Sequence, residues 1–137
     1  MKNELTLKKK EFRIKQFSLR KKLFTKVKKI FNKKLIEDFF YKINLDNIQI
    51  VSSFNSINTE IDTSELNKYI LKKNKILCLP VIFKKDKHLL FRKFTNKSDM
   101  IKGYMNIEEP SKNNELLIPD LLFVPCLAYD ALGYRLG

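Results

Sequence analysis

The feature that most limits the fold is a long N-terminal stretch without helix-breaking residues. Residues 1–42 contain neither glycine nor proline. Phe17, Phe24 and Phe31 recur every seven residues, and other apolar side chains fill the i+3 and i+4 positions between them. This spacing predicts helix over most of the stretch, either unbroken or in two pieces divided near Ser18. We expect the apolar stripe to pack on a sheet.

The same stretch holds most of the excess positive charge. Residues 1–42 carry 15 Lys or Arg and 4 Asp or Glu, whereas 43–137 carry 13 and 11. A nucleic-acid-binding arm, a site for an anionic ligand and an AT-rich genome would each produce such a skew. With 24 Lys, 12 Asn and 14 Ile but 4 Arg, genome bias explains much of it. The arginines, whose planar fork lysine cannot replace, are therefore the more informative cations: Arg13, Arg20, Arg92 and Arg135.

After residue 42 the pattern changes to short apolar runs separated by polar segments. Four runs read as strands, at 47–54, 75–83, 88–94 and 120–124. Pro80 should limit the second of them to an edge or a bend in its later half.

Between the first two runs, 64–73 predicts a helix capped by Thr63 or Ser64, with Glu65 in its first turn. The polar segment 96–114 reads as a loop, and 128–136 as a hairpin or turn around Gly133. This alternation predicts one α/β domain over 1–137, a layered αβα arrangement with a mainly parallel sheet. It divides into a basic helical region, 1–42, and a strand–helix–strand core, 43–137.

Several classes of protein are disfavoured. No apolar run approaches the roughly 18 residues of a membrane span, and the N-terminus lacks a secretory signal, so we expect a soluble, cytoplasmic protein without membrane contact. Cys78 and Cys126 lie in apolar settings without a CxxC motif, which favours buried free thiols over a disulfide. His88 is the one histidine, so a zinc site has no support.

Five strings in series point to a known family. They are KKEFR at 9–13 with Arg20 seven residues on, TEIDT at 59–63, CLPVIFKKDKHLLFRKF at 78–94, NIEEP at 106–110 and PDLLFVPCLAYDALGYRLG at 119–137. In this order and at these separations they resemble the 5-formyltetrahydrofolate cyclo-ligases, also called methenyltetrahydrofolate synthetases. The last string is the most specific, because it joins a strand ending in VP to an acidic residue and then G-x-R-L-G.

The resemblance implies an ATP-dependent ligase of folate metabolism. In this family ATP with Mg²⁺ phosphorylates the formyl oxygen on N5 of 5-formyltetrahydrofolate. The N10 amine then attacks the activated carbon, and loss of phosphate leaves 5,10-methenyltetrahydrofolate and ADP. Such a site needs cations for the triphosphate, an apolar cleft for the pterin and a carboxylate to orient the reacting groups.

The resemblance also implies site residues. Glu60 and Asn55 match substrate-binding positions, although the family usually has an apolar residue at the latter. The positions matched to ATP binding are Lys9, Lys10, Glu11, Phe12, Arg13, Arg135, Leu136 and Gly137.

Each of these positions has a plainer alternative. Lys9 is equally a surface lysine, and Arg135 a structural arginine of the hairpin. The alternative for Glu60, an acid that stabilises the dipole of the following helix, suits Asp62 better. No catalytic residue and no metal ligand is assigned.

The chain departs from the family where the nucleotide loop G-x-R-L-G-x-G-x-G-Y-Y-D would continue past Gly137. The expectation is a domain incomplete at its C-terminus, poorly active alone, and either a truncated product, a partner of a separate C-terminal fragment, or part of a longer protein. Asn106 stands where the family usually has glycine, and Cys126 where it has a small or apolar residue. Two alternatives remain: an inactive remnant, and a basic nucleic-acid-binding module, which the core spacing of the phenylalanines and the acidic strings disfavour.

Overall fold

The computed structural model describes residues 2–27, 33–82 and 88–137. Within them, a five-stranded sheet has the order β6-β3-β2-β1-β7. Its strands are β1 (Ile50–Ser52), β2 (Ile76–Val81), β3 (Leu90–Lys93), β6 (Leu116–Leu117) and β7 (Leu121–Leu122). β1 pairs in parallel with both β2 and β7, while β3 runs antiparallel to β2 and β6. The predicted α/β class with a parallel sheet centre is confirmed.

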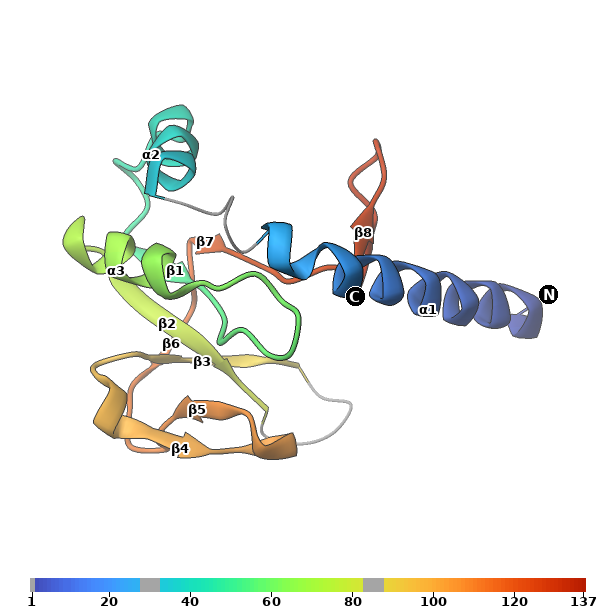
Figure 1. Cartoon of the computed structure of the whole chain (residues 1–137). Coiled ribbons are helices and arrows are strands. Elements are labelled where there is room, and N and C mark those ends of the chain that lie inside the picture. The colour runs from blue at the N-terminus through green and yellow to red at the C-terminus, as the bar shows by residue number, and fades with distance from the viewer. Residues whose placement is uncertain (1, 28–32, 83–87) are drawn as a thin grey trace.

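The remaining elements surround this sheet (Figure 1). The helices are α1 (Lys2–Val27), α2 (Lys33–Lys42) and α3 (Ser64–Lys72). Two antiparallel pairs are β4 (Met100–Lys102) with β5 (Glu108–Pro110), and β8 (Ala128–Tyr129) with β9 (Arg135–Leu136). Two short 3-10 helices are η1 (Lys97–Asp99) and η2 (Tyr104–Asn106). None of the helices in the described ranges combines the length and apolar character that crossing a bilayer requires.

The core lies between the sheet and the helices α2 and α3. Each of these helices buries two apolar side chains four residues apart, on one face. They pack on apolar side chains of β1 and β2, and the cluster consists of Ile36, Phe40, Val51, Leu66, Ile70, Leu77 and Leu79. The helical spacing of 64–73 and the continuous apolar run within 75–83 therefore encode the two halves of one interface.

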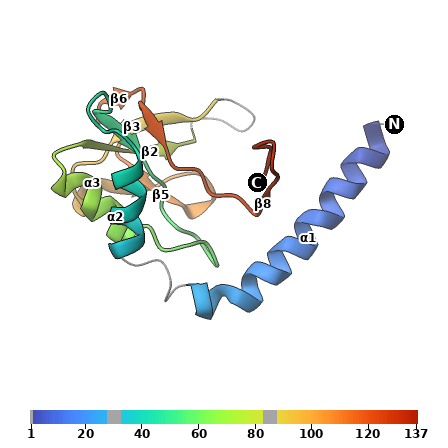
Figure 2. The same ribbon diagram turned by 90° about the horizontal axis from the view of Figure 1, so that it is seen from above.

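Helix α1 extends away from this core, as both ribbon views show (Figures 1 and 2). Its apolar side chains are spread around the helix, and Phe12 and Phe17 remain 46% and 42% exposed. The prediction that this stripe packs on a sheet is wrong for α1, because Leu19, Leu23 and Phe24 line a cavity instead and the apolar side chains nearer the N-terminus are exposed. The helix also continues through Ser18, so a break there is wrong. Phe31 lies outside the described residues.

The segment 96–114, predicted as loop, contains the β4–β5 pair. In Figure 1 this pair lies below the strands of the sheet, and α2 and α3 lie above them. Strands of two or three residues are too short to show alternation, which is why the sequence pattern missed β4, β5 and the two-residue β6. The turn before β5 places Asn106 at φ 59°, a conformation that glycine adopts freely and asparagine tolerates.

Pro80 occupies a local sheet edge, as predicted. The register between β1 and β2 covers Ile76 to Cys78, and beyond it Pro80 pairs with Phe91 of β3. The hairpin around Gly133 is also confirmed, and Gly133 has φ +83°, in the region that favours glycine.

Asp120 joins the start of β7 to the start of β1. Its Oδ2 accepts hydrogen bonds from the backbone N–H groups of Ile50 (2.8 Å) and Gln49 (2.9 Å). These two bonds hold the pKa of Asp120 below its ordinary value of 3.8. The folded state therefore favours the ionised form of Asp120. This preference stabilises the fold above pH 3.8, and the stabilisation is lost as pH falls through the lowered pKa.

We expect Asp120→Asn to lower the thermal unfolding midpoint at pH 7. The difference from wild type should shrink below pH 4, where wild-type Asp120 itself takes up a proton. Circular dichroism melts across pH measure both effects. Asp38→Asn is the control, because Asp38 is exposed on α2 and has no hydrogen bond or ion pair within the described residues. Equal midpoints for wild type and Asp120→Asn at pH 7 would contradict the assignment.

Candidate functional site

A cavity of about 610 Å³ lies beyond the carboxyl ends of β1 and β7. The segments that follow these two strands form part of its wall, and the C-terminal half of α1 together with α2 forms the rest. Most of the lining is apolar, including Leu23, Phe24, Leu35, Phe39, Phe54, Ile61 and Phe123. The carboxyl edge of parallel strands is where open α/β sheets bind ligands. A mostly apolar wall suits a flat organic ligand.

Glu60 is one of the few charged groups on this wall. Its turn is closed by the Glu60 N–H donating to the Ile57 carbonyl, 3.0 Å, and Asn58 takes φ 52° within it. Glu60 Oε2 in turn accepts the Ile57 N–H at 3.0 Å. The turn thus holds a half-buried carboxylate on the wall of an apolar cavity.

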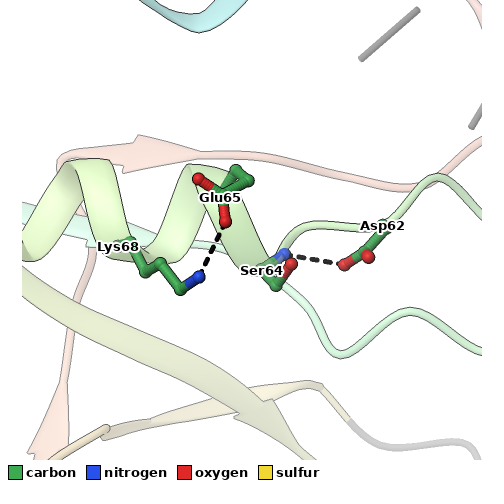
Figure 3. A network of polar contacts seen from close by, with 4 residues as sticks. All are labelled: Asp62, Ser64, Glu65 and Lys68. Atoms are coloured by element: carbon green, nitrogen blue, oxygen red, sulfur yellow. Dashed lines mark hydrogen bonds and ion pairs between the residues drawn. The ribbon is translucent and has the colours of Figure 1, made fainter. Parts of the chain in front are cut away.

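Asp62, two residues later, has the structural role (Figure 3). Its Oδ1 accepts the backbone N–H of Ser64 at 2.9 Å, at the N-terminus of α3. Thr63 does not cap the helix with its side chain, because its hydroxyl donates to the Phe54 carbonyl at 2.6 Å. Thr63 therefore occupies the N-cap position, as predicted, but the side chain that bonds to the first turn is that of Asp62. The acid that stabilises the start of α3 is therefore Asp62 and not Glu60.

Asn55 is placed differently from Glu60. Its Nδ2 donates to the Glu108 carbonyl at 2.8 Å and so ties the loop after β1 to β5. Asn55 does not belong to the set of described residues that line the cavity. The structure thus brings one of the two predicted substrate residues to the cavity wall.

The two segments predicted to bind ATP meet in space, although 124 residues separate them. Arg13 Nε on α1 donates to the Gly137 carbonyl at 2.8 Å. The guanidinium of Arg135 lies beside the same glycine: Arg135 Nη1 is 3.2 Å from the position that a Cβ on Gly137 would occupy. Lys9 lies one turn before Arg13 on α1, exposed and without an ion pair in the described part of the chain. These cations together form an exposed surface suited to an anion.

The other residues predicted to bind ATP are exposed or half-buried. Lys10, Glu11 and Phe12 are exposed on α1. Leu136 is half-buried in β9, where it pairs with Ala128. Within the described ranges, no group of three or more His, Cys, Asp or Glu side chains is placed to hold a metal ion. These residues therefore do not by themselves fit a Mg²⁺ site.

The two cysteines differ from one another. Cys78 is fully buried in β2, and burial raises the pKa of its thiol to about 11. Cys126 is exposed and lines the cavity, so the prediction of a buried thiol is wrong for it. The segment 123–127 follows a strand but packs along the cavity rather than within the core, which apolar neighbours in sequence do not reveal. Both thiols are free.

Arg20, which the sequence analysis singled out without assigning it a role, also lines the cavity. Its Nε donates to Thr59 Oγ1 at 3.1 Å, and its guanidinium carbon lies 5.3 Å from the centroid of the Phe17 ring. The sequence signals were an arginine in a lysine-rich chain and its place in the first family string, and neither specifies which segment Arg20 contacts.

Comparison with known proteins identifies the family of this chain. The model of the 5-formyltetrahydrofolate cyclo-ligase family matches residues 6–137. The 5-formyltetrahydrofolate cyclo-ligase of Haemophilus influenzae is 35% identical over 96 residues, covering 66% of this chain and 50% of that protein. The Escherichia coli K12 protein of the same name is 30% identical over 92 residues, covering 64% and 50%.

A solved structure is similar as well. The NMR structure of Aquifex aeolicus 5,10-methenyltetrahydrofolate synthetase aligns with a TM-score of 0.74 at 26% identity, covering 94% of this chain and 66% of that one. The chain spans about half the length of the curated relatives it matches.

Proposed function

Because the chain belongs to the 5-formyltetrahydrofolate cyclo-ligase family, we propose that it serves the ATP-dependent conversion of 5-formyltetrahydrofolate to 5,10-methenyltetrahydrofolate, in the cytoplasm. In that reaction the formyl oxygen takes the γ-phosphoryl group of ATP and ADP leaves. The N10 amine then bonds to the formyl carbon, and the C–O bond to phosphate breaks. The observation that carries the proposal is the half-buried carboxylate of Glu60 on the wall of an apolar cavity at the strand ends.

The cavity residues have two tasks in this proposal. The apolar wall, which includes Phe39, Phe54 and Phe123, takes the pterin and excludes water from the reacting groups. The Glu60 carboxylate accepts hydrogen bonds from N–H groups of the pterin and so fixes its orientation. Because the Ile57 N–H already fixes the position of this carboxylate, ligand binding need not restrict the Glu60 side chain much further.

The cations near the β8–β9 hairpin bind the nucleotide in this proposal. Arg13 and Arg135 converge on Gly137 and offer planar guanidinium groups to phosphate oxygens. Lys9, one turn away on α1, adds a further positive charge. When bound, Mg²⁺ would spread charge on the transferring phosphoryl group, but the described residues assign no ligand to it.

Thiol reactivity tests the proposal on the purified 137-residue chain. Bound 5-formyltetrahydrofolate should cover Cys126, so an aromatic disulfide reagent should modify that thiol about tenfold more slowly at a ligand concentration ten times Kd. Cys78 is the internal control, because burial and its raised pKa should keep it unreactive until the chain unfolds. Peptide mapping by mass spectrometry assigns each modification. An unchanged Cys126 rate at saturating ligand would contradict the proposed site.

The same assay separates the nucleic-acid alternative. Its specific support is the exposure of Phe12 and Phe17 among the lysines of α1. A nucleic-acid-binding chain would bind RNA with steep salt dependence and would leave the Cys126 rate unchanged when 5-formyltetrahydrofolate is added.

A further inference from the structure

Arg20 holds a positive charge at the wall of the mostly apolar cavity, which also carries the carboxylates of Glu60 and Asp62. It is half-buried, and it lines the cavity together with Thr59 and Glu60. Its Nε uses one of the five guanidinium N–H groups in the bond to Thr59 Oγ1. This bond fixes the plane of the guanidinium and leaves its two amino groups to other partners.

No acidic side chain neutralises this charge in the described part of the chain. The ion pairs found there join Lys8 to Glu4, Lys33 to Glu37 and Lys68 to Glu65. Glu60, the nearest acid in sequence to Thr59, accepts a hydrogen bond from the Ile57 N–H instead. Removing a charge from water without a partner is costly, so an unpaired guanidinium in an apolar cavity indicates an anion supplied by the ligand.

We infer that Arg20 is an oxyanion-binding residue of the cavity and that its two amino groups take oxygens of the bound ligand. The inference rests on the proposed function, which offers two sources of that chemistry: the glutamate carboxylates of the folate and the phosphates of ATP. A guanidinium forms bidentate hydrogen bonds with both carboxylates and phosphates.

The position of Arg20 on α1 allows either source. Arg20 lies seven residues after Arg13, two helical turns or about 10 Å along the axis and on nearly the same side. Arg13 contacts the hairpin at Gly137, whereas Arg20 contacts the loop at Thr59. The helix therefore places Arg20 between the cavity and the exposed cationic surface that includes Arg13.

The test measures the Kd of the 137-residue chain for three ligands by calorimetry. They are 5-formyltetrahydrofolate, an uncharged 5-formyltetrahydropterin analogue without the aminobenzoyl-glutamate, and ATP. Arg20→Met should weaken binding of one anionic ligand about tenfold or more, because it removes hydrogen bonds to a charged group. Arg20→Lys, which keeps the charge but loses the fork, should give a smaller loss. Lys22→Met, an exposed lysine on the same helix, should change no Kd by more than about twofold.

Each pattern of results is decisive. A loss confined to the glutamate-bearing folate identifies a carboxylate, and a loss confined to ATP identifies a phosphate. Equal losses for the folate and its uncharged pterin analogue, or no loss for any ligand, would overturn the inference while leaving the proposed function intact. If wild type binds none of the three although its unfolding is cooperative, the proposed function itself fails.

Discussion

Replacing Glu60 by Gln is expected to weaken binding of 5-formyltetrahydrofolate about 10- to 100-fold. The change keeps the size and shape of the side chain but removes its charge. Hydrogen bonds to a charged group contribute about 1.5–3 kcal/mol, and the apolar cavity wall limits compensation by water. The calorimetric Kd of the 137-residue chain measures the effect.

The matched control is Glu65→Gln on α3. Glu65 lies five residues further along the chain and bonds to Lys68 at 2.7 Å on the exposed side of the helix (Figure 3). Exposed pairs of this kind contribute little, so this variant should bind the folate within about twofold of wild type. If Glu60→Gln and Glu65→Gln give the same Kd, Glu60 is not a ligand-binding residue. ATP binding should be unchanged in both variants.

Replacing Arg13 by Ala is expected to weaken ATP binding about 10- to 100-fold. The substitution removes a guanidinium that would bind phosphate, and it also removes the hydrogen bond to the Gly137 carbonyl. Affinity for 5-formyltetrahydrofolate should be unchanged, because Arg13 does not belong to the described residues that line the cavity. Calorimetry with each ligand separately measures both quantities.

Lys15→Ala is the control for charge alone. Lys15 is two residues from Arg13, so it points to a different side of α1 and loses the same formal charge when replaced. We expect a change of less than about twofold at 0.15 M salt, where exposed charges are screened within about 8 Å. Equal losses in the Arg13 and Lys15 variants would mean that ATP senses the net charge of α1 and not a site.

The sequence itself determined the local features. Side chains spaced i, i+4 specified the buried faces of α2 and α3, and the continuous apolar run at 75–83 specified β2 as a strand of the core. The motif strings specified the family, and chemical reasoning separated the cavity carboxylate Glu60 from the helix-capping Asp62. These features depend on neighbours within a few positions, which is the range that periodicity and turn chemistry encode.

Tertiary structure alone decided which of these segments meet. Arg13 contacts Gly137 and Arg20 contacts Thr59 across 124 and 39 residues, and nothing in the spacing of either arginine specifies its partner. The exposure of α1 and of Cys126 was likewise not predictable, because an apolar side chain is buried only if another element supplies a surface for it. Periodicity defines the faces of each element, but how those faces assemble depends on packing between elements that are distant in the chain.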